Sequence, residues 1–202
     1  MSIIKLNNRS VKDITEFGSI SSLGSLNFIS STTASDAAYL TITSGISSTY
    51  KEYIFYFVNM HPETNDVALK GNFTTDGTNF NVSKNTAFFG AVQDAGDTYT
   101  GISYSTGRDV ALGTGDLTIS QSVGNANDDC TCGYLHLFNP ASTTFAKSFK
   151  SRMTTRWAVA GEEAAADDFG AGFLVTTSAV TGFRCNMSSG NLNGTVLLFG
   201  LS

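Results

Sequence analysis

Three side chains that could bind a metal ion lie close together in the sequence, as Cys130-x-Cys132-x-x-x-His136. Thiolate and imidazole groups are ligands that zinc prefers, but this is not the spacing of a zinc finger or a zinc ribbon. A strand through this stretch would also place His136 too far from Cys132 for one tetrahedral ion. We therefore expect no metal and no other cofactor, and we expect the cysteines, Cys185 included, to pack as small apolar groups.

Catalytic patterns are equally incomplete. His61 and His136 could each belong to a Ser-His-Asp arrangement, but the sequence has no Gly-x-Ser-x-Gly elbow to present the serine. An acidic stretch could supply the paired carboxylates of a glycoside hydrolase, and its members are Glu162, Glu163, Asp167 and Asp168. These groups are crowded into an Ala-rich segment, where solvated charge is the common explanation. We expect a protein that is not an enzyme, with a polysaccharide-degrading enzyme as the weakest alternative.

Composition excludes further classes of function. The 202-residue chain carries a net charge of −5, and its 12 Lys and Arg residues are scattered, whereas a nucleic-acid binder needs them clustered. No apolar run reaches the roughly 20 residues needed to cross a bilayer, and the first residues lack the features of a signal peptide. We expect synthesis in a cytoplasm, no membrane association and, in that reducing compartment, free thiols.

The sequence pattern predicts an all-β fold. Within residues 52–58, the six residues from Tyr53 to Val58 are all aromatic or aliphatic, so both faces of the expected strand are apolar, which places it in the middle of the molecule. Residues 194–201 share this property, so we predict that the two strands pair. About a dozen short strands bounded by Gly, Asn, Asp and Ser predict a single antiparallel β-sandwich, jelly-roll-like, over residues 26–202.

Residue types predict two further local features. Asp76-Gly77 is a strong turn signal, and we predict a hairpin between the strand that ends near Phe73 and residues 80–82. The acidic stretch, residues 161–168, is predicted to be a loop or one helical turn.

Residues 1–25 differ from the rest of the chain, because their large aliphatic side chains follow no sustained period of 2 or 3.6. We interpret this segment as an extended arm. It could be a poorly ordered terminus or an edge strand, or it could dock on a neighbouring subunit. The residues that would make the docking contacts are Ile3, Ile4, Leu6, Val11, Ile14 and Phe17.

Several segments of the chain resemble small virion proteins of cyanophages and other marine tailed phages. The similarity covers roughly residues 26–202 and is carried by the segments 45–57, 59–62, 81–84, 88–89, 135–145, 187–191 and 194–200. These are strand and turn sequences without a catalytic signature, and neither the acidic stretch nor the Cys130/Cys132 pair belongs to the resemblance. It implies a β-sandwich structural protein of the virion, either a capsid decoration (cement) protein or a tail-fibre-like protein.

The resemblance and the residues together give two expected functions. The first is a decoration protein that binds the major capsid protein or other virion subunits through its arm, as a homo-oligomer and, from phage architecture, a trimer. The second is a tail-fibre or receptor-binding module whose loops contact host glycans. The loop residues proposed for such contacts are Asp94, Asp97, Tyr99, Asp116, Glu162 and Asp168, and the candidate aromatic platform residues are Tyr99, Tyr104 and Trp157.

Overall fold

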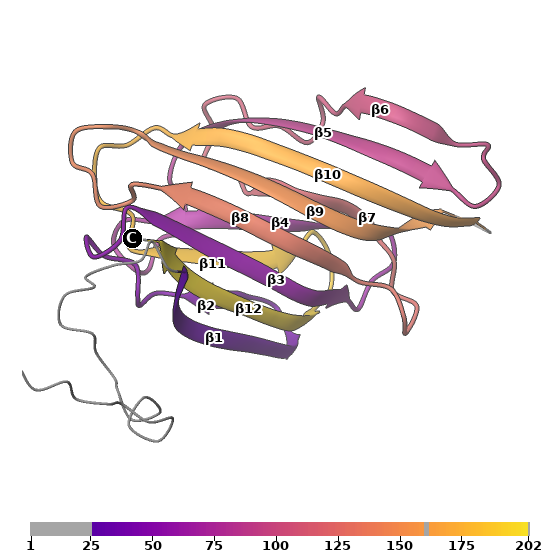
Figure 1. Ribbon diagram of the computed structural model, residues 1–202, viewed down its shortest axis with the longest axis horizontal. Coiled ribbons are helices and arrows are strands. Elements are labelled where there is room, and N and C mark those ends of the chain that lie inside the picture. Colours follow the sequence, from indigo (N-terminus) through magenta and orange to yellow (C-terminus); the bar gives the residue numbers. More distant parts are fainter. Residues whose placement is uncertain (1–25, 160–161, 202) are drawn as a thin grey trace, which may run out of the picture.

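The computed structural model describes residues 26–159 and 162–201 (Figure 1). Within these residues the chain forms twelve β-strands and no helix, and the strands pair antiparallel. The strands are β1 (Leu26–Ala37), β2 (Leu40–Ile42), β3 (Glu52–Pro62), β4 (Val67–Thr74), β5 (Lys84–Asp94), β6 (Thr100–Tyr104), β7 (Leu117–Val123), β8 (Thr131–Phe138), β9 (Lys147–Val159), β10 (Glu162–Leu174), β11 (Gly182–Met187) and β12 (Leu192–Leu201). The all-β prediction is confirmed.

The strands lie in two layers that join into one nearly closed, barrel-like sheet. The large layer has the order β1-β12-β3-β8-β9-β10-β5-β6, and the small layer, which lies behind it in Figure 1, has the order β7-β4-β11-β2. One residue pair, Val123 with Trp157, links β7 to β9 and so connects the layers. On the opposite side, β1 lies beside β2. The jelly-roll-like arrangement expected from the sequence stays a prediction.

The strand expected at the centre, β3, is hydrogen-bonded along both edges, to β12 and to β8. The predicted pairing of the first aromatic strand with the last strand is therefore confirmed. Tyr53, Phe55 and Phe57 are buried, but Tyr56 is only half-buried and Val58 is exposed. The expectation that both faces of this strand are covered is wrong, because only one face of the large layer meets the small layer.

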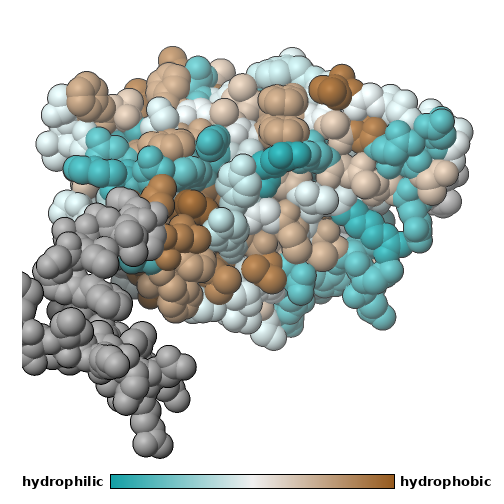
Figure 2. All heavy atoms as spheres, viewed as in Figure 1, coloured by the Kyte–Doolittle hydropathy of each residue, from teal (hydrophilic) through white to brown (hydrophobic). Residues whose placement is uncertain are grey.

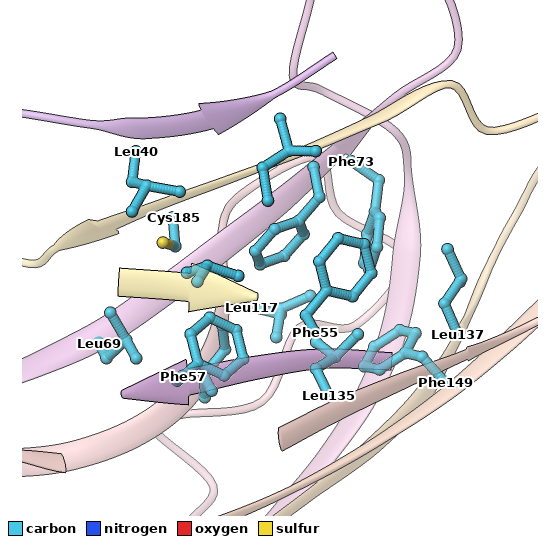
Figure 3. Packing of buried hydrophobic residues seen from close by; sticks show 14 of the residues in the cluster. Leu40, Phe55, Phe57, Leu69, Phe73, Leu117, Leu135, Leu137, Phe149 and Cys185 are labelled. Atoms are coloured by element: carbon cyan, nitrogen blue, oxygen red, sulfur yellow. The ribbon is translucent and has the colours of Figure 1, made fainter. Parts of the chain in front are cut away.

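The core fills the space between the two layers. The rings of Phe55 and Phe57 lie 4.8 and 6.1 Å from the ring of Phe183 on β11, a strand to which β3 makes no hydrogen bonds. Phe183 also contacts Phe73 of β4, with ring centroids 5.2 Å apart. Figure 3 shows these strands contributing aromatic and aliphatic side chains to one continuous cluster. Aromatic side chains are the largest apolar groups available, so they contribute most to the burial that holds the layers together.

The predicted turn at Asp76-Gly77 is present, but the predicted hairpin is wrong. Gly77 has a φ of 81°, in the region that favours glycine. Strand β4 is paired with β7 along one edge and with β11 along the other. Because both edges are occupied, residues 80–82 find no free edge, and only one backbone hydrogen bond, from Val82 to Phe73 at 3.5 Å, joins them to β4.

The acidic stretch is part of a strand, so its assignment as a loop or helical turn is wrong. Its described residues, 162–168, form the first half of β10, which is hydrogen-bonded to β9 on one edge and to β5 on the other. Ala164 and Ala166 are buried while Ala165 is exposed, which is the alternation of a strand with one covered face. The hydrogen bonds of two neighbouring strands outweigh the weak β-propensity of Ala, Asp and Glu here.

The described part of the chain contains no helix that is long and apolar enough to span a membrane. The expected docking residues Ile3, Ile4, Leu6, Val11, Ile14 and Phe17 lie outside the described residues, and so do positions 160, 161 and 202.

Candidate functional site on the outer face of the large layer

Aromatic side chains form a row across the outer face of the large layer, the face turned away from the core. The strand register places six residues directly opposite one another on successive strands from β3 to β6, and we call them the aromatic row: Tyr56, Tyr134, Arg152, Phe169, Phe89 and Tyr104. Because neighbouring strands lie about 4.8 Å apart, the row is roughly 24 Å long. It combines the aromatic and Arg residues that are enriched where proteins bind one another.

Neighbouring side chains of the row pack against each other, although Phe89 and Tyr104 stay partly exposed. Phe89 and Phe169 stack with centroids 4.8 Å apart and planes 3° from parallel. The Arg152 guanidinium lies 4.9 Å from the Phe169 ring centre, and its Nε donates to the Asp167 carboxylate at 2.9 Å. Phe89 and Arg152 occupy the two faces of the Phe169 ring, so this ring offers mainly its edge to a partner. Such a surface suits apolar side chains better than the flat face of a sugar.

Small residues on both sides of the row leave shallow grooves. On one side, Ala87 and Ala171 lie in a groove of about 290 Å³ whose lining includes Phe89 and Tyr134. On the other side, a groove of about 460 Å³ is lined by Gln93, Thr154, Arg156 and Glu163, among others. The outer face therefore has a ridge with a groove on each side, a shape that can receive an extended chain.

The apolar character continues along the layer to both of its edges. Towards one edge, Phe28 is 61% exposed and packs on Phe199 at 5.5 Å, and Val58 is 39% exposed. Towards the other edge, Ile102 is 77% exposed and Tyr104 is 53% exposed. Figure 2 views this face and shows apolar residues spread over it between charged ones, with a dense group where β3 and β12 run. So many exposed apolar side chains on one face of the molecule favour an interaction site there.

One end of the outer face is acidic. Arg156 is the only cation in a group with three carboxylates: Asp128, Asp129 at 3.2 Å and Glu163 at 3.0 Å. The hydrogen bond from Arg156 lowers the pKa of Asp128 below its ordinary value. With one guanidinium against three carboxylates, this end of the face keeps a net negative charge that would attract a basic group.

The β5–β6 turn holds three of the predicted host-contact residues. One of them, Asp94, stabilises the turn through hydrogen bonds. Its carboxylate accepts the backbone N–H groups of Thr98 and Tyr99, each at 2.9 Å, and the Thr98 hydroxyl at 2.6 Å. These bonds, that of the hydroxyl first, lower the pKa of Asp94. Asp97 is exposed and accepts from Gln93 at 2.9 Å. Asp94 is buried, so its assignment as a host contact is wrong.

Tyr99 is 54% exposed and lies on Trp157, with ring centres 5.6 Å apart. Two of the three candidate aromatic platform residues therefore meet. The Trp157 indole N–H is buried and has no hydrogen-bond partner within the described structure. Tyr104, the third candidate, belongs to the aromatic row.

Asp116 lies far from the β5–β6 turn. It accepts a hydrogen bond from Asn72 at 2.8 Å and faces Lys84, which opens β5, whereas Asp94 closes this 11-residue strand. The ends of such a strand are roughly 33 Å apart. Lys84 is buried, and this burial, partly offset by Asp116, lowers its pKa to about 8. The predicted contact loops thus do not form one surface, and the side chain of Glu162 lies outside the described part of the chain.

Asp168 is wholly buried, so the prediction that it contacts a host surface is wrong. Its Oδ2 accepts the Ser120 hydroxyl at 3.1 Å and the Gln121 backbone N–H at 2.9 Å. Ser120 in turn shares hydrogen bonds with Thr155 at 2.6 Å and with Thr131 at 3.1 Å. Burial raises the pKa of Asp168 to about 6 despite these bonds. The network joins β7, β8, β9 and β10 where the layers meet, so its role is to hold these strands together.

The cysteines and histidines do not form a metal centre among the described residues. The Cys130 and Cys132 sulfurs lie 4.0 Å apart as free thiols, and burial raises the pKa of Cys130 to about 11. His136 points instead to Glu52, at 2.8 Å, and burial lowers its pKa. The third thiol, Cys185, is buried in the core as expected.

Searches against protein-family models, curated proteins and solved structures found no match to this chain. The candidate site therefore stands on its geometry. Sequence reasoning missed the aromatic row, because its six members come from six strands that are scattered along the chain. One signal was present: residues 52–58 are apolar on both faces, although only one face reaches the core.

Proposed function

We propose that this chain is a structural protein of a phage virion, and first a decoration or cement protein that binds neighbouring subunits on the capsid. The observation that supports the proposal is the outer face of the large layer, where Phe28, Ile102 and Tyr104 are each more than half exposed beside a ridge of stacked rings. A monomeric soluble protein rarely leaves so many large apolar side chains of one face uncovered. Assembly with other subunits would cover it.

In this proposal the partners are the major capsid protein or other virion subunits, including further copies of the chain, and the trimer is the oligomer that we expect. Repetition on a symmetric particle would supply avidity, so that no single contact needs to be strong. The resemblance to phage virion proteins over residues 26–202 points in the same direction, and it implies a location in the virion after synthesis in the host cytoplasm.

Cryo-electron microscopy of the intact particle tests this proposal. We expect density for the chain over the capsid lattice, with the large layer turned towards a neighbouring subunit. Density at the tail tip with the loops pointing outward would replace the cement function by the receptor-binding one. Particles that contain no copy of the chain would overturn both.

A receptor-binding module is the second candidate, and Tyr99 supports it. This half-exposed ring lies on Trp157 at the end of the molecule where Gln93, Arg156 and Glu163 line the groove of about 460 Å³. Planar polar side chains near an aromatic ring are a common setting for sugar recognition. A glycan array would test it: Tyr99→Ala should abolish any binding, while Tyr39→Ala, at an exposed ring on another part of the surface, should leave it intact.

The acidic stretch gives little support to a glycosidase. Successive residues of a strand point to opposite faces, so Asp167 and Asp168 do not share a cleft. Asp167 is paired with Arg152 on the outer face, and Asp168 is buried on the inner one. A retaining or inverting enzyme requires two carboxylates about 5–9.5 Å apart that flank one bond.

A further inference from the structure

We propose that the ridge and grooves of the outer face receive residues 1–25 of a neighbouring copy of the chain. This inference rests on the proposed assembly function and names the surface through which it would act. The partner segment is identified by its chemistry, which matches that of the surface in apolar content, in charge and in length.

The apolar content of the segment fits the grooves. It contains eight large apolar residues spaced among polar ones: Ile3, Ile4, Leu6, Val11, Ile14, Phe17, Ile20 and Leu23. Ala87 and Ala171 leave room on one side of the aromatic row, and Ala165 leaves room on the other. An extended chain places alternate side chains on one face, so part of this set can enter a groove while the remainder stays in solvent.

The charges are complementary. The segment holds three basic residues, all within its first twelve positions, and two acidic ones, so its net charge is +1. The remainder of the chain holds nine basic and fifteen acidic residues, so its net charge is −6. The excess of carboxylates around Arg156, at one end of the grooves, is a suitable place for Lys5, Arg9 or Lys12.

The length is sufficient for exchange between copies. A 25-residue extended segment reaches roughly 80 Å, more than three times the length of the aromatic row. It is joined to the molecule at Leu26, which pairs with Leu201 at the edge of the large layer. An arm that starts at an edge can leave its own subunit and cross the layer of the next one, so every copy would give one arm and receive one.

Photocrosslinking of the full-length chain tests the inference. Phe17 is replaced by the photoreactive p-benzoylphenylalanine in unlabelled protein, which is mixed with an equal amount of ¹⁵N-labelled protein and irradiated. We expect crosslinks from unlabelled chains to ¹⁵N-labelled peptides of β5, β8, β9 or β10. The same substitution at Tyr39, whose ring lies under Arg184 of the small layer, is the matched control and should not label these strands.

Two variants locate the contact. Phe89→Arg places a charge on the aromatic row and should reduce the yield of mixed crosslinks at least tenfold, whereas Leu112→Arg, at a site that is 68% exposed in the β6–β7 connection, should leave it unchanged. If Phe89→Arg lowers the midpoint of urea unfolding, the salt dependence of crosslinking replaces this variant as the test. Raising the salt from about 0.1 M to about 1 M should lower the yield for the unaltered surface.

Crosslinks confined to single chains would overturn the exchange, because the arm would then cover its own subunit. Mixed crosslinks to other strands, or the absence of crosslinks, would overturn the assignment of this face. Failure of this inference is distinguishable from failure of the proposed function: particles that carry the chain on their capsid while the outer face stays unlabelled would retain the function and reject the docking surface.

Discussion

Asp167 and Asp168 are adjacent in the chain, yet one carboxylate is paired with Arg152 on the outer face while the other is enclosed by β7, β9 and β10. This separation is a direct result of strand alternation. It also gives the two acids different electrostatic roles, which predicts different responses to pH and to mutation.

Asp168→Asn should remove the loss of folding stability that accompanies ionisation of this buried carboxyl group. Burial raises the folded pKa of Asp168 to about 6 from an ordinary value of 3.8, so the folded chain holds a proton that the unfolded chain has released. Protonated Asp168 therefore contributes its full stabilisation below about pH 4. This contribution decreases as the pH rises through about 6 and is lost above that value. By linkage, the free energy of unfolding falls by about 3 kcal/mol over this range. Urea unfolding at several pH values should show that the variant lacks this decrease.

Asp167→Asn is the control for that measurement. It removes an exposed ion pair, so the free energy of unfolding should change by less than about 1 kcal/mol. If Asp168→Asn and the wild type lose stability in parallel between pH 4 and pH 7, the buried network does not hold the proton.

Lys84→Met should act in the alkaline range with the opposite sign. Burial lowers the folded pKa of Lys84 to about 8 from 10.5, so the unfolded chain binds a proton that the folded chain releases between these values. Wild-type stability should therefore rise relative to the variant by about 3 kcal/mol between pH 8 and pH 10.5. Urea unfolding measures this difference, and Lys51→Met, at an exposed position, should show none. If the difference in free energy of unfolding between wild type and Lys84→Met does not change with pH, the pKa of Lys84 is not lowered by burial.

Phe55→Ala should destabilise the fold by about 3–5 kcal/mol, because it leaves a cavity between β3 and β11 where the Phe55 and Phe183 rings meet at 4.8 Å. Phe145→Ala, at a ring that is 68% exposed, should change stability by less than about 0.5 kcal/mol. Denaturant unfolding of both variants decides the point, and an unchanged midpoint for Phe55→Ala would mean that β3 is wrongly placed.

The three thiols should differ in reactivity. Cys185 is wholly buried, which raises its pKa to about 12, whereas Cys130 and Cys132 are partly exposed. Titration of the native protein with an aromatic disulfide should modify at most two thiols, and the third should react only after denaturation. Cys185→Ser should abolish the denaturant-dependent step. Rapid reaction of three thiols in the native state would contradict the packing of β11.

Much of the fold could be predicted from the sequence, because strand periodicity is a local signal. Residues 52–58 and 194–201 are apolar on both sides, and they pair as predicted. The hairpin at residues 80–82 could not be excluded in the same way, because the strands that occupy both edges of β4 are β7 and β11, which come from distant parts of the sequence.

The candidate site was less predictable than the fold. Residue type alone predicts that Asp94 and Asp168 lie at the surface. Both are buried, where their carboxylates accept hydrogen bonds from the hydroxyls of Thr98 and Ser120. Phe89 and Phe169 are eighty positions apart and become stacked only through the register of β5 with β10. Register is a property of the assembled sheet, and a single strand does not contain it.

The single pair between Val123 and Trp157 has a consequence for how the layers are joined. Along this seam the backbone ladder between β7 and β9 is reduced to one pair, and side chains join the strands instead: Ser120 bonds to Thr155 of β9, and Asp168 of β10 accepts from Ser120 and from the Gln121 backbone N–H. Backbone hydrogen bonds form whatever the residue type, whereas these bonds require particular side chains. The junction of the two layers is therefore a place where a single substitution can remove a connection between strands, which is not the case along the continuous ladders within the large layer.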